Sequence, residues 1–228
     1  MKKTIIALMA LAGVAAAETL TFEVVRNTNA ITFEFAEVTA QEILTLTYTD
    51  WTYSGGGNNN VGSWQSPTNE AYQNSFSPDA QLRDHAGDNL LVDSWTMNFT
   101  VTNNSDADIT LTQFTFDAYS YYGGGNDRND GDRSQVTLTL GEITTDRFSL
   151  GIRGNTETAT LDLTGDNAIT IGANKTVTLA LTMTGADPAN TYTGITAGSV
   201  TYAIVPEPAT ATLSLLALAG LAARRRRK

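Results

Sequence analysis

Two segments rich in aromatic residues and glycine contain the side chains best suited to binding chemistry. The first is residues 51–58 and the second is residues 119–126; each starts with aromatic residues and ends in three glycines and an asparagine. Aromatic rings beside amide and carboxylate groups are typical of sugar sites, because the rings stack on sugars while the polar groups bind hydroxyls. The candidate ligand-binding residues are Trp51, Tyr53, Tyr119, Tyr121 and Tyr122.

The same two segments have a plainer interpretation. Three consecutive glycines add conformational freedom and do not preorganise a site. Their aromatic neighbours would then close the end of a hydrophobic core. The sugar-binding interpretation requires the loops at 54–60 and 123–132 to converge in space, and both interpretations stay open at this point.

An acidic stretch at residues 126–132 supplies three candidate calcium ligands, Asp127, Asp130 and Asp132. Carboxylate oxygens are the ligands that calcium prefers. An EF-hand starting at Asp127, however, places Gly131 at the fifth position, where a ligand is needed, and has no glutamate at the twelfth. Two neighbouring arginines also offset the charge. We therefore expect a solvated turn here and no bound cofactor.

Catalytic chemistry has little support in this sequence. Four titratable residues lie close together in the chain, namely Asp79, Asp84, His85 and Asp88. A carboxylate pair is the machinery of glycoside hydrolysis, but acidic residues are common here and their proximity in sequence says little. The absence of cysteine excludes a thiol nucleophile, a thiolate metal site and disulfides. We expect no enzyme and assign no catalytic residue.

The charge balance argues against nucleic acid as a partner. The whole chain has a net charge of −10, and residues 18–204 carry 7 Lys and Arg against 23 Asp and Glu, a net of −16. Such a surface repels a phosphate backbone.

The elements that must position these side chains are β-strands. Apolar residues alternate with polar ones in many segments, for example in residues 95–101, and threonine alternates with apolar residues along 176–184. Threonine suits the exposed face of a half-buried antiparallel sheet. The alternation slips by one position between Leu111 and Phe114, which predicts a β-bulge. The pattern predicts an all-β fold, a two-sheet antiparallel, jelly-roll-like β-sandwich, with residues 54–89 as a long excursion. It does not distinguish jelly-roll from immunoglobulin-like strand connectivity.

Thr-x-Thr pairs recur at 45–47, 47–49, 100–102, 110–112, 137–139, 176–178 and 182–184. An ice-binding face stacks such pairs in register, which usually appears as a repeat of fixed length. The spacings here are irregular, so the strand preference of threonine is the simpler explanation.

Both ends of the chain have features of targeting segments. Lys2 and Lys3 precede an apolar run and three alanines, a pattern that predicts a signal peptide cleaved after Ala17. At the other end, Pro-Glu-Pro is followed by an uncharged, leucine-rich run at 209–223 and a basic cluster. The run predicts a single hydrophobic helix of ~22 Å, shorter than the ~30 Å hydrocarbon core of a bilayer.

This C-terminal order of motif, apolar run and arginines resembles the PEP-CTERM sorting signals of bacteria, and the resemblance covers residues 205–228. The resemblance implies two partners, an exosortase-type sorting protease and the membrane in which the protein is held during sorting. By resemblance, the recognition motif is Pro206, Glu207 and Pro208. The flank of the membrane anchor is Arg224, Arg225, Arg226 and Arg227.

We therefore expect a signal peptide at 1–17, a β-sandwich ectodomain at 18–204 and a sorting and transmembrane tail at 205–228. The protein is expected to be exported, anchored through its C-terminal helix and then moved to the cell surface or extracellular matrix, with a structural or adhesive role. A carbohydrate-binding module with an extracellular polysaccharide as partner is the alternative. Ice binding and calcium binding are less favoured.

Overall fold

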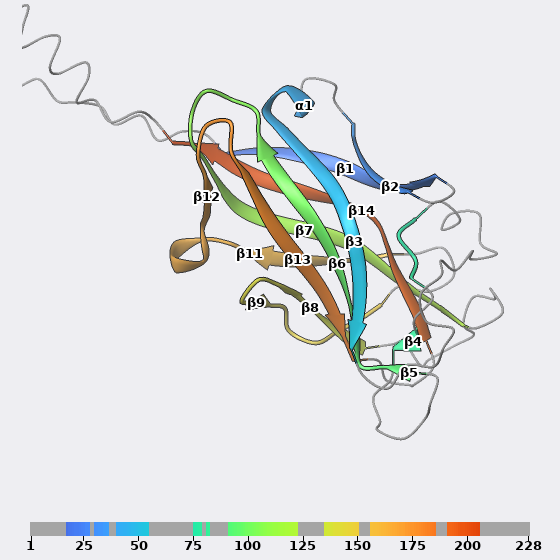
Figure 1. The fold of residues 1–228 in the computed structure, drawn as a ribbon. Coiled ribbons are helices and arrows are strands. Elements are labelled where there is room, and N and C mark those ends of the chain that lie inside the picture. The colour runs from blue at the N-terminus through green and yellow to red at the C-terminus, as the bar shows by residue number, and fades with distance from the viewer. Residues whose placement is uncertain are drawn as a thin grey trace, which may run out of the picture.

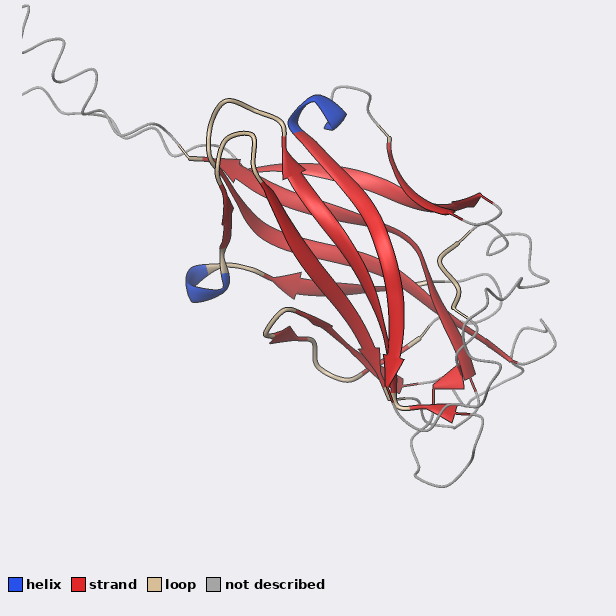
Figure 2. Cartoon of the chain, viewed as in Figure 1, coloured by secondary structure: helices blue, strands red, loops and turns tan. Residues whose placement is uncertain are grey.

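The computed structural model describes residues 17–27, 30–36, 40–54, 75–78, 81–82, 91–122, 135–150, 156–185 and 191–205. Within these ranges the chain forms two largely antiparallel sheets packed face to face (Figure 1). Figure 2 shows how little helix accompanies them in the described part of the chain. The predicted all-β sandwich is confirmed.

The first sheet contains, in spatial order, β11 (Glu157–Asp162), β7 (Ile109–Tyr122), β14 (Thr191–Ile204), β1 (Ala17–Asn27) and β2 (Ala30–Phe35). In addition, β12 (Ile169–Ile171) pairs with β7, and β4 (Gln81–Leu82) pairs with β14 and with β5 (Leu91–Val92). The second sheet contains β10 (Phe148–Ser149), β8 (Gln135–Leu140), β13 (Thr176–Thr184), β6 (Ser94–Asn103) and β3 (Leu44–Ser54), with β9 (Ile143–Thr144) beside β8. Among the described residues, two short helices lie outside the sheets, α1 (Ala40–Ile43) and the 3-10 helix η1 (Gly165–Asn167).

The strand pairing is that of a jelly roll. Pairs nest within one another along the sequence: β1 with β14, β6 with β13, β7 with β11, and β8 with β10. The first and second halves of the chain therefore wind together as one long folded hairpin. Strands β2 and β3 are inserted between β1 and β6, and each extends one edge of its sheet. The jelly-roll-like sandwich expected from the sequence is thus confirmed, and the strand connectivity, which the sequence left open, is that of a jelly roll.

The core follows from the alternation of apolar and polar residues. Strand β6 buries every second side chain from Trp95 to Asn103. The ring of Phe99 reaches the opposite sheet, with centroid distances of 5.5 Å to Phe33 and 6.1 Å to Phe114. Tilted and edge-on ring pairs of this kind add to the free energy gained by burial. The aromatic rings therefore join the two sheets.

A β-bulge in β7 confirms the predicted slip in alternation. Thr201 of β14 lies opposite Gln113, whereas the next residue, Tyr202, lies opposite Leu111, so Thr112 is the extra residue. Because of the bulge, the apolar side chains on both sides of Thr112 point into the core. These core residues are Ile109, Leu111, Phe114 and Phe116. Further register shifts occur between Tyr48 and Asp50 and between Ile195 and Ala197.

The long excursion predicted at 54–89 is fixed to the sandwich in its middle. Residues 75–78 are all buried. Phe76 exchanges two backbone hydrogen bonds with Ile195 (3.0 and 2.9 Å), and its ring lies 5.1 Å from that of Trp95. The approach is so close that a Cβ at Gly194 would lie 2.4 Å from the carbonyl oxygen of Phe76. The segment therefore forms an isolated antiparallel β-bridge beside β14.

Candidate functional site

The two ends of the sandwich carry different parts of the chain. Strand β1 begins at Ala17, opposite Ala203 of β14, one residue before the domain start expected from the sequence. The beginning of β1 and the end of β14 therefore lie side by side, at the upper left of Figure 1. We call this the tether end. The opposite, distal end is where β3 and β13 finish, beside β5 (Figure 1).

The strands that lead into the two glycine-rich segments both finish at the distal end. Tyr122, the last residue of β7, pairs with Thr191, which in turn pairs with Leu82 of β4. Strand β4 pairs with β5, and the next residue, Asp93, donates its amide hydrogen to the carbonyl of Ser54 at 2.7 Å. Residues 55–60 and 123–132 of the two loops lie outside the described residues, but the strands before them end on the same side of the molecule.

Trp51 and Tyr53 form an aromatic pair near this end. They lie opposite Met97 and Trp95 in the register of β3 and β6, on the side of the sheet that faces the core. Because β3 is an edge strand, Tyr53 is 42% exposed while Trp51 is half-buried against the core. The two ring centroids are 6.2 Å apart at an interplanar angle of 43°. An exposed tyrosine supported by a half-buried tryptophan can stack on a flat, partly apolar ligand.

Tyr48 continues this aromatic row toward the core. Its ring is half-buried and lies 6.2 Å from that of Phe76. Burial raises the pKa of Tyr48 to about 12, and the nearby Asp50 carboxylate adds to the rise. The phenol therefore stays protonated well above neutral pH.

Tyr119 does not belong to this surface, which corrects the sequence-based set. Its side chain is fully buried, and its hydroxyl lies 2.5 Å from the hydroxyl of Ser75. A ring enclosed in this way cannot stack on a ligand, and it holds the excursion against β7 instead. The backbones of Tyr121 and Tyr122 belong to β7, but their side chains lie outside the described part.

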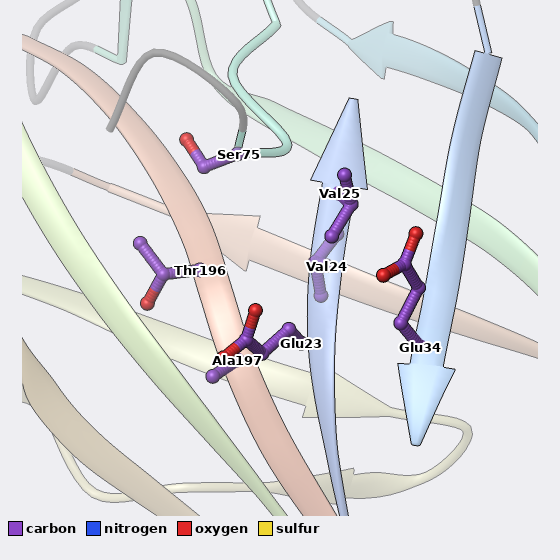
Figure 3. A pocket seen from close by; sticks show the side chains of 7 residues that line it. All are labelled: Glu23, Val24, Val25, Glu34, Ser75, Thr196 and Ala197. Atoms are coloured by element: carbon purple, nitrogen blue, oxygen red, sulfur yellow. The ribbon is translucent and has the colours of Figure 1, made fainter. Parts of the chain in front are cut away.

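A hollow of about 560 Å³ lies where β1 separates from β14 (Figure 3). The pairing of these strands ends at Glu23 and Ala197, and the bridge from Phe76 to Ile195 takes over beyond it. The lining residues are Glu23, Val24, Val25, Glu34, Ser75, Thr196 and Ala197. Glu23 and Glu34 are direct cross-strand neighbours, and like charges in such pairs are unfavourable. Their carboxylates can accept hydrogen bonds from the hydroxyls of a polyol.

The outer face of the second sheet is covered with hydroxyl groups. The register of β3, β6 and β13 aligns their outward threonines in rows, for example Thr47, Thr100 and Thr178. Several cross-strand pairs are hydrogen-bonded, including Thr96 with Thr182 at 2.8 Å. Among the outward residues of these three strands, Asp50 is the one charged group, and Asn98 donates to it at 2.7 Å. The face suits contact with an uncharged, hydroxylated partner.

The remaining sequence-based site residues lie outside the described residues. This applies to the motif residues Pro206, Glu207 and Pro208, to Arg224–Arg227, and to Asp127, Asp130 and Asp132. In the described ranges, no three carboxylate or imidazole side chains gather in a way that would hold a metal ion. Those ranges also contain no helix of the length and apolarity that a membrane crossing requires.

Residues 205–228 match the family model of the PEP-CTERM protein-sorting motif. The C-terminal segment is a PEP-CTERM motif. It begins directly after β14, at Val205, whose amide hydrogen is donated to the carbonyl of Asp108 at 2.8 Å. A PEP-CTERM motif implies an exported protein that an exosortase processes at the membrane.

Several solved structures show weak similarity to this chain. The mosquito-larvicidal Cry4Aa toxin of Bacillus thuringiensis is 10% identical over 49% of this chain and 18% of its own, with a TM-score of 0.29. The isomalto-dextranase of Arthrobacter globiformis T6, solved with panose, is 12% identical over 82% and 32%, with a TM-score of 0.32. TmCBM61, solved with β-1,4-galactotriose, is 10% identical over 67% and 88%, with a TM-score of 0.29.

The chain thus spans less than a third of the length of the toxin and of the dextranase. No curated protein matches it in sequence. Similarities of this size carry no argument about activity or ligand.

Proposed function

We propose that this exported protein has a structural or adhesive role at the cell surface or in the extracellular matrix, without catalytic activity. Two features support the proposal. The sorting motif directly follows the last strand, so that the whole sandwich is the cargo of the sorting tail. The outer face of the second sheet carries hydroxyl pairs between strands, and these form a regular polar surface.

This role can be tested by comparing two cell populations. One produces the full chain, and the other produces the chain without residues 206–228. The full chain should be recovered from the surface or matrix fraction and should increase adhesion between cells. The truncated chain should be released and should not increase adhesion. Recovery of the intact chain from the cytosol, with residues 1–17 still attached, contradicts the proposal.

A second candidate function is carbohydrate binding, and the Trp51–Tyr53 pair is the observation that favours it. The exposed ring of Tyr53 lies at the distal end, where the strands before both glycine-rich segments finish. Polysaccharides offer the flat, partly apolar sugar faces that stack on such rings, and hydroxyls that match the surrounding polar groups. An adhesive protein that binds a matrix polysaccharide would combine both roles.

A glycan array with the full-length chain tests the second function. Tyr53→Ala and Trp51→Ala should each weaken binding about tenfold, which corresponds to ~1.4 kcal/mol. Thr52→Ala is the matched control, since Thr52 is exposed on the opposite side of the same strand. Equal binding by Tyr53→Ala and the control would exclude the aromatic pair as the sugar site.

A further inference from the structure

Both targeting segments join the sandwich at the tether end. Ala17 and Ala203 are register partners, and the hydroxyls of Thr19 and Thr201 are 2.9 Å apart. Tyr202 donates its hydroxyl hydrogen to Glu18 at 2.6 Å. The strands that continue into residues 1–16 and 206–228 are therefore fastened to each other. A membrane segment on either side would hold the domain by the same end.

The distal end is about one strand length away. Strand β14 runs from Thr191 at the distal end to Ile204 at the tether end; its 14 residues are separated by 13 steps along the strand. At ~3.3 Å per residue this is roughly 43 Å. Pairing with β7 along nearly the whole of β14 keeps this strand extended.

We propose that the anchored protein stands on its tether end and presents the distal end, with Trp51 and Tyr53, away from the bilayer. The orientation is inferred from the strand topology together with anchoring through the C-terminal segment, and the choice of a polysaccharide as the distal partner rests on the proposed function. A separation of roughly 40 Å exceeds the ~8 Å Debye length at physiological ionic strength. Polysaccharide bound at Tyr53 would thus lie beyond the surface charge of the membrane.

The absence of cysteine permits a direct measurement of this orientation. Thr176 and Thr184 are exposed on the same face of β13, and Thr176 lies at the tether end and Thr184 at the distal end. Eight residue steps place them roughly 26 Å apart. Thr176→Cys and Thr184→Cys variants of the full-length chain, labelled with the same donor fluorophore, would be placed in phosphatidylcholine vesicles that contain an acceptor-labelled lipid.

Energy transfer to the lipid should be severalfold stronger from position 176 than from position 184. Equal transfer would mean that the sandwich lies flat on the bilayer, and stronger transfer from position 184 would mean that it is inverted; either result overturns the proposal. Transfer from neither position overturns it as well, because the chain would not be held at the bilayer. Polysaccharide binding is measured separately on the same vesicles, so a loss of that function leaves the transfer ratio unaffected.

Discussion

Individual polar side chains hold the distal end together. The indole of Trp95 donates to the hydroxyl of Thr193 at 2.7 Å, and both groups are buried. The hydroxyls of Ser75 and Tyr119 form a second buried polar pair nearby. Buried polar groups of this kind are costly when they lose their partners. The position of residues 75–78 beside β14 thus depends on a few buried polar groups, such as the hydroxyls of Ser75 and Tyr119.

Gly194 is another position at the distal end, and close packing there leaves no room for a side chain. An alanine Cβ would lie 2.4 Å from the Phe76 carbonyl oxygen and 2.5 Å from the Tyr119 hydroxyl, and the nearer of these two is backbone. We expect Gly194→Ala to lower the free energy of unfolding by about 2 kcal/mol or more. Urea unfolding followed by tryptophan fluorescence measures this. Gly172→Ala is the control, since its Cβ would have ordinary contacts of 3.4 and 3.6 Å; similar losses in both variants would contradict the packing argument.

Tyr48 makes stability depend on alkaline pH. Its pKa in the folded state is raised to about 12, mainly by burial and further by Asp50. An unfolded tyrosine ionises near pH ~10, so between these values the unfolded state loses the proton while the folded state keeps it. Below pH ~10, ionisation of Tyr48 should therefore give the free energy of unfolding no pH dependence. From there toward pH about 12, the free energy of unfolding should fall. Urea midpoints across this range should fall less in Tyr48→Phe than in the unaltered protein, and parallel profiles would contradict the assignment.

Residue types alone predicted part of the candidate site. Trp51 and Tyr53 could be named because their aromatic character and their place at a strand end are visible in the sequence. The sequence left open whether Tyr119 contacts a ligand or closes the core, because its hydroxyl partner in the fold, Ser75, lies 44 residues earlier in the chain. The hollow beside Glu23 was also hidden, since it arises where two strands separate in space.

At the level of strands, alternation was a reliable guide where a strand has one buried face. The predicted slip between Leu111 and Phe114 is real: Thr112 is the extra residue, and the buried side chains, two on each side of it, change parity there. Two-residue strands such as β4 and β9 carry no pattern of their own and exist only through their partners. Register was equally hidden: threonine pairs at irregular spacing in the sequence form aligned rows once β3, β6 and β13 pair.

The boundary between β14 and the sorting motif leads to a prediction about truncation. Ending the chain after Val205 removes no strand, so its free energy of unfolding should match that of the full chain within ~0.5 kcal/mol in the same detergent. Ending it after Gly198 removes the buried side chains of Val200 and Tyr202 together with their strand pairing. That shorter chain should unfold at much lower urea concentration or fail to fold. A clear destabilisation of the chain ending at Val205 would show that the tail contributes to the fold.

At the level of the whole molecule, the sequence predicted the sandwich but not its winding. The alternation of apolar and threonine residues requires two packed sheets. The pairing of β1 with β14 and of β6 with β13, however, joins strands far apart in the sequence. No local pattern records which of two compatible strands becomes a neighbour. The acidic composition, in contrast, can be read directly from the sequence.

This acidity leads to a prediction about calcium. A ligand that binds only the native state raises its thermal midpoint. Because the stretch at 126–132 departs from the EF-hand register, we expect the midpoint to be the same with and without millimolar calcium. Magnesium at the same concentration is the control for general charge screening. A rise of several degrees with calcium alone would show that Asp127, Asp130 and Asp132 hold an ion.

The paired ends of β1 and β14 also mean that the polypeptide is almost a closed ring. A short linker from Ile204 back to Ala17 would complete it, and the ring could be reopened between β13 and β14 with every strand intact. Such a circular permutant would attach the sorting tail after Gly185, at the aromatic end. The same sandwich would then be anchored in the reverse orientation, with its aromatic distal end toward the membrane and its tether end away from it.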